Sequence, residues 1–248
     1  MRELAWRRLP RKIIFIRHGE AEHNLEGCAI LQEDNPNRKP DNLSELTPRG
    51  REQARAAGHR LRRLLGGGGT ISAVVSPFER TQQTLYALQQ NLGDVRVRRV
   101  HVDPRVREQE FGNFQEKDDM AFHRETASEV GRFWYRRPTG ESGADVYDRA
   151  SSFWDDVLTG LGTPNPMETY EVPEKRKGWV GKSDDALLVV THGLTMRLLV
   201  ANRRSNPRSR ELSNSRGRLS PAGARSAPMQ LMRYFQWSPQ TFDAVYNP

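Results

Sequence analysis

Cysteine is almost absent from this sequence. Cys28 is the single cysteine among 248 residues, so a disulfide within the chain is excluded, and with it the class of small secreted proteins that disulfides hold together. So little cysteine is typical of a reducing compartment, and we therefore expect a cytoplasmic protein.

Apolar residues are also scarce, at 35 % of the chain, and the mean hydropathy is −0.79. No apolar run approaches the roughly 20 residues that a membrane span requires, so we expect no membrane association. The basic stretch from Met1 to Lys12 is not followed by the apolar core of a signal peptide, and we expect a solvated arm. The sequence further lacks a compact cluster of His, Cys and carboxylate residues with metal-site spacing, so we expect no bound metal.

What the sequence does contain is a set of short apolar runs, each followed at once by polar residues. Such runs, rich in β-branched residues, are typical of strands buried on both faces of a parallel sheet. Because the carboxyl ends of parallel strands share one edge of a sheet, we expect the polar residues to meet in one crevice. The three runs and their polar ends are Ile13–Ile16 before Arg17-His18-Gly19, Ile71–Val75 before Ser76 to Arg80, and Ala186–Val190 before Thr191-His192-Gly193.

Two histidines and two arginines at one crevice indicate a pocket for a phosphoryl group. The guanidinium group is a planar fork that matches phosphate oxygens. A neutral histidine is a competent nucleophile near neutral pH, and a second histidine can donate to the phosphoryl oxygens. The net charge of +8 also suits a phosphorylated partner.

Helical patterns separate these strands. Thr47 and Pro48 are typical of a helix start, and the following helix is expected to stop at Gly66 to Gly69. Further helices are predicted over 78–91 and from Glu141-Ser142 onward, and an edge strand over 95–102. This alternation predicts an α/β fold, a three-layer α/β/α sandwich with a mainly parallel central sheet, formed by residues 1–248 as a single domain.

Several motifs in this order resemble those of the histidine phosphatase superfamily, with its phosphoglycerate mutase-like fold. Within it, the segments 106–115 and 140–149 resemble the plant and fungal branch of broad-range acid phosphatases. The motifs are Arg17-His18-Gly19-Glu20, Asn24, Ser76-Pro77, Arg80-Thr81, Glu108 before Phe111-Gly112, Gly140-Glu141-Ser142 and Thr191-His192-Gly193.

The resemblance implies a phosphomonoester hydrolase that acts on a small phosphorylated substrate without a cofactor. His18 would attack phosphorus and become phosphohistidine, while Arg17, Arg80 and His192 hold the phosphoryl oxygens. Glu108 would protonate the leaving alcohol and then deprotonate the attacking water. Asn24 would add one more donor to the phosphate.

Some assignments stay open at this point. Glu110 lies close enough in sequence to compete with Glu108 for the acid role, whereas His23, His59, His101 and His123 have no comparable setting and are interpreted as surface residues. A phosphoglycerate-mutase-type phosphotransferase is an alternative, but the family's mutases usually place Arg after the acid, where this chain has Gln109.

A basic segment interrupts the last predicted helix. Leu194 to Leu199 begins that helix and Leu231 to Trp237 reads as its continuation, while residues 200–230 between them hold seven arginines and one glutamate. Such a composition buries no core, so we predict a disordered insert. It supplies most of the net charge of the chain.

We hypothesise that this insert is an in-frame retained intron. Valine codons begin with GT, a glutamine codon ends in AG, and removal of Val200 to Gln230 restores the family pattern. The functional alternative is a loop that binds nucleic acid on an inactive phosphatase-like module.

Overall fold

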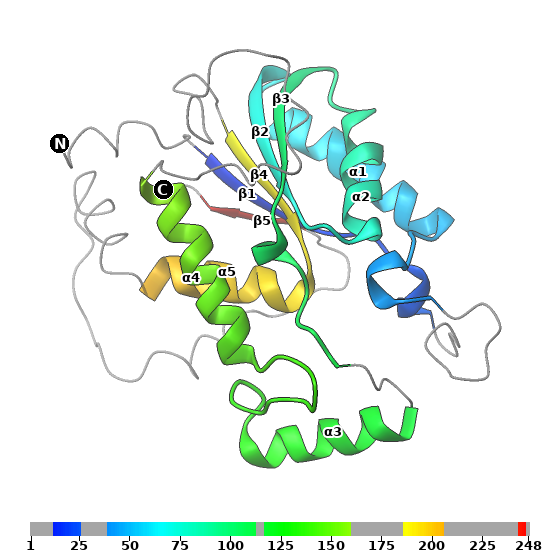
Figure 1. The fold of residues 1–248 in the computed structure, drawn as a ribbon. Helices are drawn as coiled ribbons and strands as arrows, with labels where there is room; N and C mark the ends of the chain where they lie inside the picture. The colour runs from blue at the N-terminus through cyan, green and yellow to red at the C-terminus, as the bar shows by residue number, and fades with distance from the viewer. Residues whose placement is uncertain (1–11, 26–38, 113–116, 160–185, 206–242, 247–248) are drawn as a thin grey trace.

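The computed structural model of the chain describes residues 12–25, 39–112, 117–159, 186–205 and 243–246. Its described strands form one five-stranded sheet in the order β3-β2-β4-β1-β5 (Figure 1). The first four in this order are parallel, and β5 is antiparallel to β1, so the sheet is mainly parallel as predicted. The strands are β1 (Lys12–Arg17), β2 (Gly68–Val75), β3 (Asp94–Val102), β4 (Ala186–Thr191) and β5 (Asp243–Tyr246).

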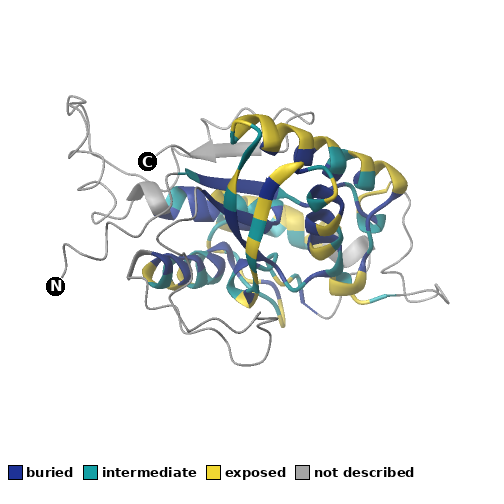
Figure 2. Cartoon of the chain, turned by 90° about the horizontal axis from the view of Figure 1, so that it is seen from above, coloured by how far each residue is buried: buried dark blue, intermediate teal, exposed yellow. Residues whose placement is uncertain are grey.

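Helices cover both faces of the sheet and make the predicted three layers. On β1, Ile14 and Ile16 pack in the cluster that includes residues of the first two helices, and Ile13 and Phe15 pack in the cluster on the opposite face. Figure 2 shows these strands buried between helices whose outer surfaces are exposed. The helices are α1 (Pro48–Leu64) and α2 (Glu79–Gln89) on one face, and α4 (Gly143–Thr159) and α5 (Gly193–Ser205) on the other.

The start of α1 follows from local chemistry. The hydroxyl of Thr47 accepts a hydrogen bond from the backbone N–H of Gly50 at 3.0 Å, and Pro48 occupies the first helical position. The helix ends before Gly66 and Gly67, whose φ angles of 74° and 85° lie in the left-handed region that glycine adopts without strain. These features confirm the predicted bounds of the helix, although β2 begins at Gly68 rather than at Ile71.

The last predicted helix is longer than the sequence suggested. Helix α5 does not end at Leu199 but continues to Ser205, into the predicted insert. Val200 is buried in a cluster with apolar residues of α4, among them Phe153 and Trp154. The carboxamide of Asn202 donates to the hydroxyl of Ser151 on the same helix. The prediction that the disordered insert begins at Val200 is therefore wrong, because residues 200–205 are helical. Their packing against α4 outweighs their unfavourable composition.

One helix has no counterpart in the sequence prediction. Helix α3 (Lys117–Val130) lies apart from the sheet (Figure 1). Over residues 121–130, for which burial is described, no side chain is buried and Phe122 and Val130 are exposed, so this part of the helix has no buried apolar stripe to predict it.

Other predictions fall outside the described residues. These are the basic arm over 1–11, the remainder of the insert over 206–230, and the helix over 231–237. Among the described helices, none is long and apolar enough to cross a membrane.

Candidate active site

The ends of β1, β2 and β4 meet at one edge of the sheet, as the sequence predicted. Arg17 pairs with Thr191 and Val75 with Val190, so the residues that follow lie at the same level. The backbone N–H of His18 donates to the Thr191 carbonyl at 3.0 Å, which extends the β1–β4 ladder into the site. The rings of His18 and His192 are consequently 5.1 Å apart, centroid to centroid.

His18 is only 2 % exposed, and its ring is held in one orientation. Nδ1 lies 2.7 Å from the carbonyl oxygen of Gly19, which can only accept, so Nδ1 carries the proton and Nε2 keeps its lone pair. Burial, together with the charges of Arg80 and Arg17, lowers the pKa of His18 well below its usual value. The imidazole is therefore neutral near pH 7, as a nucleophile must be.

His192 is fully buried and bound through its other ring nitrogen. Nε2 lies 2.8 Å from the hydroxyl oxygen of Ser76, at the end of β2. Burial and the neighbouring His18 lower the pKa of His192. A neutral ring that accepts from Ser76 at Nε2 carries its proton on Nδ1, and Nδ1 has no partner among the described residues.

Two arginine nitrogens are buried without a partner in the same way as Nδ1 of His192. The Nε atoms of Arg17 and Arg80 are buried and without a hydrogen-bond partner among the described residues. A buried donor without an acceptor costs about 1–3 kcal/mol, so three at one sheet edge need a physical reason. An anion with several oxygens would satisfy all three donors.

Arg80 is positioned by a residue that the sequence did not indicate. Its Nη1 donates to the backbone carbonyl of Asp41 at 2.6 Å, and Nη2 donates to the carboxylate of Asp41 at 3.2 Å. The guanidinium also lies over the ring of Phe78, 4.8 Å from the centroid. Asp41 lies in the short 3-10 turn Asp41–Leu43, 39 residues before Arg80 in the sequence, so no local sequence pattern predicts their contact.

His23 also belongs to the site, although it was predicted to be a surface residue. Its ring lies 5.7 Å from that of His18, and Nδ1 lies 3.0 Å from the hydroxyl oxygen of Ser44. Burial and the nearby Arg80 lower the pKa of His23 to about 4, against the opposing charge of Asp41. The turn Glu22–Asn24 brings it there, and the sequence contains no periodic signal for such a turn.

Asn24 does not join the buried donors. Its side-chain oxygen accepts from the backbone N–H of Ala21 at 3.1 Å and so closes the turn, while the residue itself is exposed. Its predicted contact with phosphate stays a prediction.

Glu108 follows the turn Pro104–Val106 and contacts the first turn of α5. It also lies close to Arg17: burial lowers the pKa of Arg17, and the negative charge of Glu108 opposes that lowering. Its Oε1 is 3.2 Å from the hydroxyl oxygen of Thr195 and 3.4 Å from the Thr195 backbone nitrogen. Glu110, the competing candidate, is exposed, and its carboxylate accepts from the backbone N–H of Gly112. The geometry favours Glu108 over Glu110.

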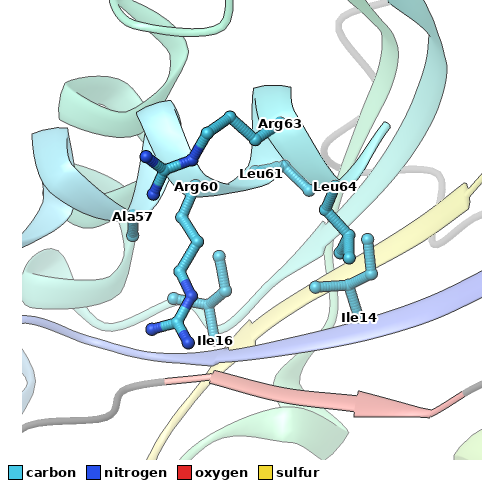
Figure 3. A pocket seen from close by; sticks show the side chains of 7 residues that line it. All are labelled: Ile14, Ile16, Ala57, Arg60, Leu61, Arg63 and Leu64. Carbon is cyan, nitrogen blue, oxygen red and sulfur yellow. The ribbon is translucent and has the colours of Figure 1, made fainter. Parts of the chain in front are cut away.

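One hollow of the described chain lies away from these residues. It has a volume of about 340 Å³ and lies between α1 and β1, and no predicted site residue lines it (Figure 3). In the described part of the chain, no group of three or more His, Cys, Asp or Glu residues could hold a metal ion. The hollow in Figure 3 is lined by Ile14, Ile16, Ala57, Arg60, Leu61, Arg63 and Leu64.

Comparison with known proteins agrees with this arrangement. Residues 13–165 match the sequence model of the histidine phosphatase superfamily, branch 1. A phosphoglycerate mutase-like protein of Arabidopsis thaliana is 38 % identical over 200 residues, which are 77 % of this chain and 65 % of the plant protein. The chain therefore spans less than two thirds of the length of this relative.

Two further similarities are more limited. A broad-range acid phosphatase of Saccharomyces cerevisiae is 36 % identical over 102 residues, which are 41 % of this chain and 26 % of the yeast enzyme. The alpha-ribazole phosphatase of Shigella flexneri superposes with a TM-score of 0.53 at 19 % identity, over 82 % of this chain and 84 % of that chain. At that identity the similarity shows a shared fold.

Proposed function

The chain belongs to the histidine phosphatase superfamily, branch 1, and from this premise we propose that it hydrolyses phosphate monoesters through a phosphohistidine at His18. One observation supports the proposal above all others. Three buried side-chain nitrogens that have no partner among the described residues, on Arg17, Arg80 and His192, lie at the sheet edge beside a neutral histidine whose Nε2 is unprotonated. The oxygens of a phosphoryl group can accept hydrogen bonds from all three nitrogens, and its phosphorus is an electrophile for Nε2 of His18.

In the first half of the reaction, Nε2 of His18 attacks phosphorus and the bond from phosphorus to the ester oxygen breaks. Arg17 Nε, Arg80 Nε and His192 Nδ1 donate to the non-bridging oxygens, whose charge they stabilise in the transition state. Glu108 gives its proton to the departing alcohol. The products are a free alcohol, a phosphohistidine and the Glu108 carboxylate.

In the second half, Glu108 takes a proton from water as the water attacks phosphorus. The bond from phosphorus to nitrogen breaks, inorganic phosphate leaves, and both His18 and Glu108 return to their starting states. The protein groups supply all the positive charge, so no metal takes part in any step.

Hydrolysis rather than phosphoryl transfer is favoured by the contacts of Gln109. In place of the arginine usual in the family's mutases, Gln109 donates from Nε2 to the backbone carbonyl of Glu141 at 2.7 Å. This side chain is thus engaged in holding the loop. Together with the resemblance to a broad-range acid phosphatase, this supports activity on several small phosphate esters.

The test is hydrolysis of p-nitrophenyl phosphate by the full chain, with and without a chelator. His18→Ala should lower kcat/KM at least about a thousandfold. His59→Ala is the matched control, because His59 is exposed on α1. Alkaline denaturation during turnover should trap labelled phosphohistidine in the wild type and in His59→Ala, but not in His18→Ala.

Two results would contradict the proposal: hydrolysis that survives in His18→Ala, or hydrolysis that the chelator abolishes. A parallel assay with 3-phosphoglycerate separates the alternatives. Release of phosphate supports a hydrolase, whereas formation of 2-phosphoglycerate would support a mutase.

A further inference from the structure

Within the described part of the chain, the contacts of the Glu108 carboxylate are made by one of its two oxygens. Oε1 receives the contacts from Thr195, through the hydroxyl at 3.2 Å and the backbone N–H at 3.4 Å, and from the Gln109 N–H at 3.1 Å. Oε2 has no comparable contact with the described residues. Oε2 is therefore the oxygen that can face the substrate.

We propose that Thr195 positions Glu108 for acid and base catalysis, an inference that rests on the proposed function. Thr195 is fully buried in the first turn of α5, three residues after His192. Its hydroxyl oxygen also lies 2.6 Å from the backbone carbonyl oxygen of Arg107, and because a hydroxyl has one proton, it donates to that carbonyl or to Oε1 at any one time. One side chain thus contacts both the carboxylate of Glu108 and the peptide bond that precedes it.

The backbone of this segment has a second, independent anchor. Arg149 on α4 donates to the carbonyl oxygens of Arg107 and Glu108 at 2.8 and 3.0 Å. The Arg149 guanidinium is itself held by both carboxylate oxygens of Glu141 at 3.1 Å. Because Arg149 keeps the backbone in place, loss of the Thr195 hydroxyl should mainly release the Glu108 side chain.

The arrangement also couples two parts of the site. The N–H of Met196 donates to the carbonyl of His192 at 2.9 Å, so His192 and Thr195 belong to one helical turn. The helical turn that presents His192 to the phosphoryl oxygens therefore also carries Thr195, which holds Glu108, the proton donor to the leaving group. General acid catalysis requires the carboxyl group to lie within hydrogen-bond distance of the leaving oxygen. The contact with Thr195 holds Glu108 at a constant position relative to the phosphoryl group that His192 binds.

The test compares two esters that differ in how much they need a proton donor. Release of an alkoxide from 2-phosphoglycerol requires protonation, whereas 2,4-dinitrophenyl phosphate releases a phenolate that is stable without it. We measure kcat/KM, which covers only the steps up to departure of the alcohol. Thr195→Val should lower kcat/KM for the alkyl ester by about ten- to a hundredfold and for the dinitrophenyl ester by less than about threefold.

Two controls make the result specific. Thr195→Ser restores the hydroxyl and should restore most of the rate on the alkyl ester. Thr191→Val removes a buried hydroxyl that donates to the Val106 carbonyl at 2.6 Å without contacting Glu108, so it should affect both esters alike. Thermal denaturation confirms that each variant is folded.

Equal losses on both esters in Thr195→Val, or no loss on either, would overturn the role of Thr195 while the proposed function stands. Failure of Thr195→Ser to recover the alkyl ester activity would also overturn it. A wild-type chain that cleaves neither ester would overturn the proposed function, and the inference with it.

Discussion

His18 and His192 each use one ring nitrogen for a contact within the protein and keep the other for chemistry. The Gly19 carbonyl can only accept and fixes the proton of His18 on Nδ1, whereas the Ser76 hydroxyl can donate to Nε2 of His192 and leave the proton of that ring on Nδ1. The same tautomer thus serves two different purposes, because different ring nitrogens point inward. In His18 the lone pair on Nε2 is available, and in His192 the N–H at Nδ1 is available.

The depressed pKa of His23 predicts how stability changes with pH. In the unfolded chain a histidine takes up a proton near pH 6.5, but in the folded chain His23 stays neutral down to about pH 4. Between these values the unfolded state binds more protons, so the free energy of unfolding rises with pH and falls as the pH is lowered. His23→Gln should reduce this slope by up to about 1.4 kcal/mol per pH unit.

Urea unfolding of the wild type and His23→Gln at pH 4.5, 5.5 and 6.5 measures the effect. His59→Gln, at an exposed position, should leave the slope unchanged. Parallel lines for the wild type and His23→Gln would show that His23 titrates normally in the folded chain.

At the scale of elements, the loop after β1 is packed backbone to backbone against the start of α1. A Cβ atom built on Gly19 would lie 2.4 Å from the carbonyl oxygen of Gly50, and one built on Gly50 would lie 2.0 Å from that of Glu20. These distances leave no room for any side chain. The contact therefore holds His18 at a fixed distance from the N-terminus of α1.

Gly50→Ala should consequently lower the free energy of unfolding by about 2–4 kcal/mol, since both partners are backbone and cannot rotate away. Chemical denaturation measures the change. Gly68→Ala is the matched control, because a Cβ atom there meets nothing within 4 Å, and it should change stability by less than about 0.5 kcal/mol. Similar values for the two variants would refute the packing argument.

The elements differ in how well the sequence reveals them. The apolar runs of β1 and β4, and the cap and glycines around α1, predict those elements because their signals are local. The extension of α5 to Ser205 and the exposed α3 are not predicted, since one depends on packing against α4 and the other has no buried stripe. The sequence does not predict that His23 and Asp41 belong to the site, for a related reason. They reach it through a contact between distant parts of the chain, in which Ala21 pairs with Leu46.

At the scale of the whole molecule, the groups that we propose to bind phosphate lie at or just after the ends of three strands that are far apart in the sequence. They meet only when β1, β2 and β4 are assembled, so an oxyanion that binds them should stabilise the folded chain alone. Vanadate at about 100 times its Kd should raise the free energy of unfolding by about 2.7 kcal/mol. Arg80→Lys should weaken binding at least about tenfold, because lysine has no N–H at the place of Nε.

Thermal shift in a vanadate titration checks both expectations. Arg96→Ala is the matched control, because Arg96 is exposed on β3, away from the strand ends that form the site, and it should bind vanadate like the wild type. An equal shift in Arg80→Lys and the wild type would place the oxyanion elsewhere.

Among the described strands, β3 forms one edge of the sheet, and an edge strand is a template for pairing with another chain. Its sequence alternates valines with arginines, and Arg96 and Arg98 are exposed. Two such edges brought together would place rows of positive charge opposite each other. The arginines of β3 therefore oppose edge-to-edge aggregation, and neutralising them should make the chain prone to it.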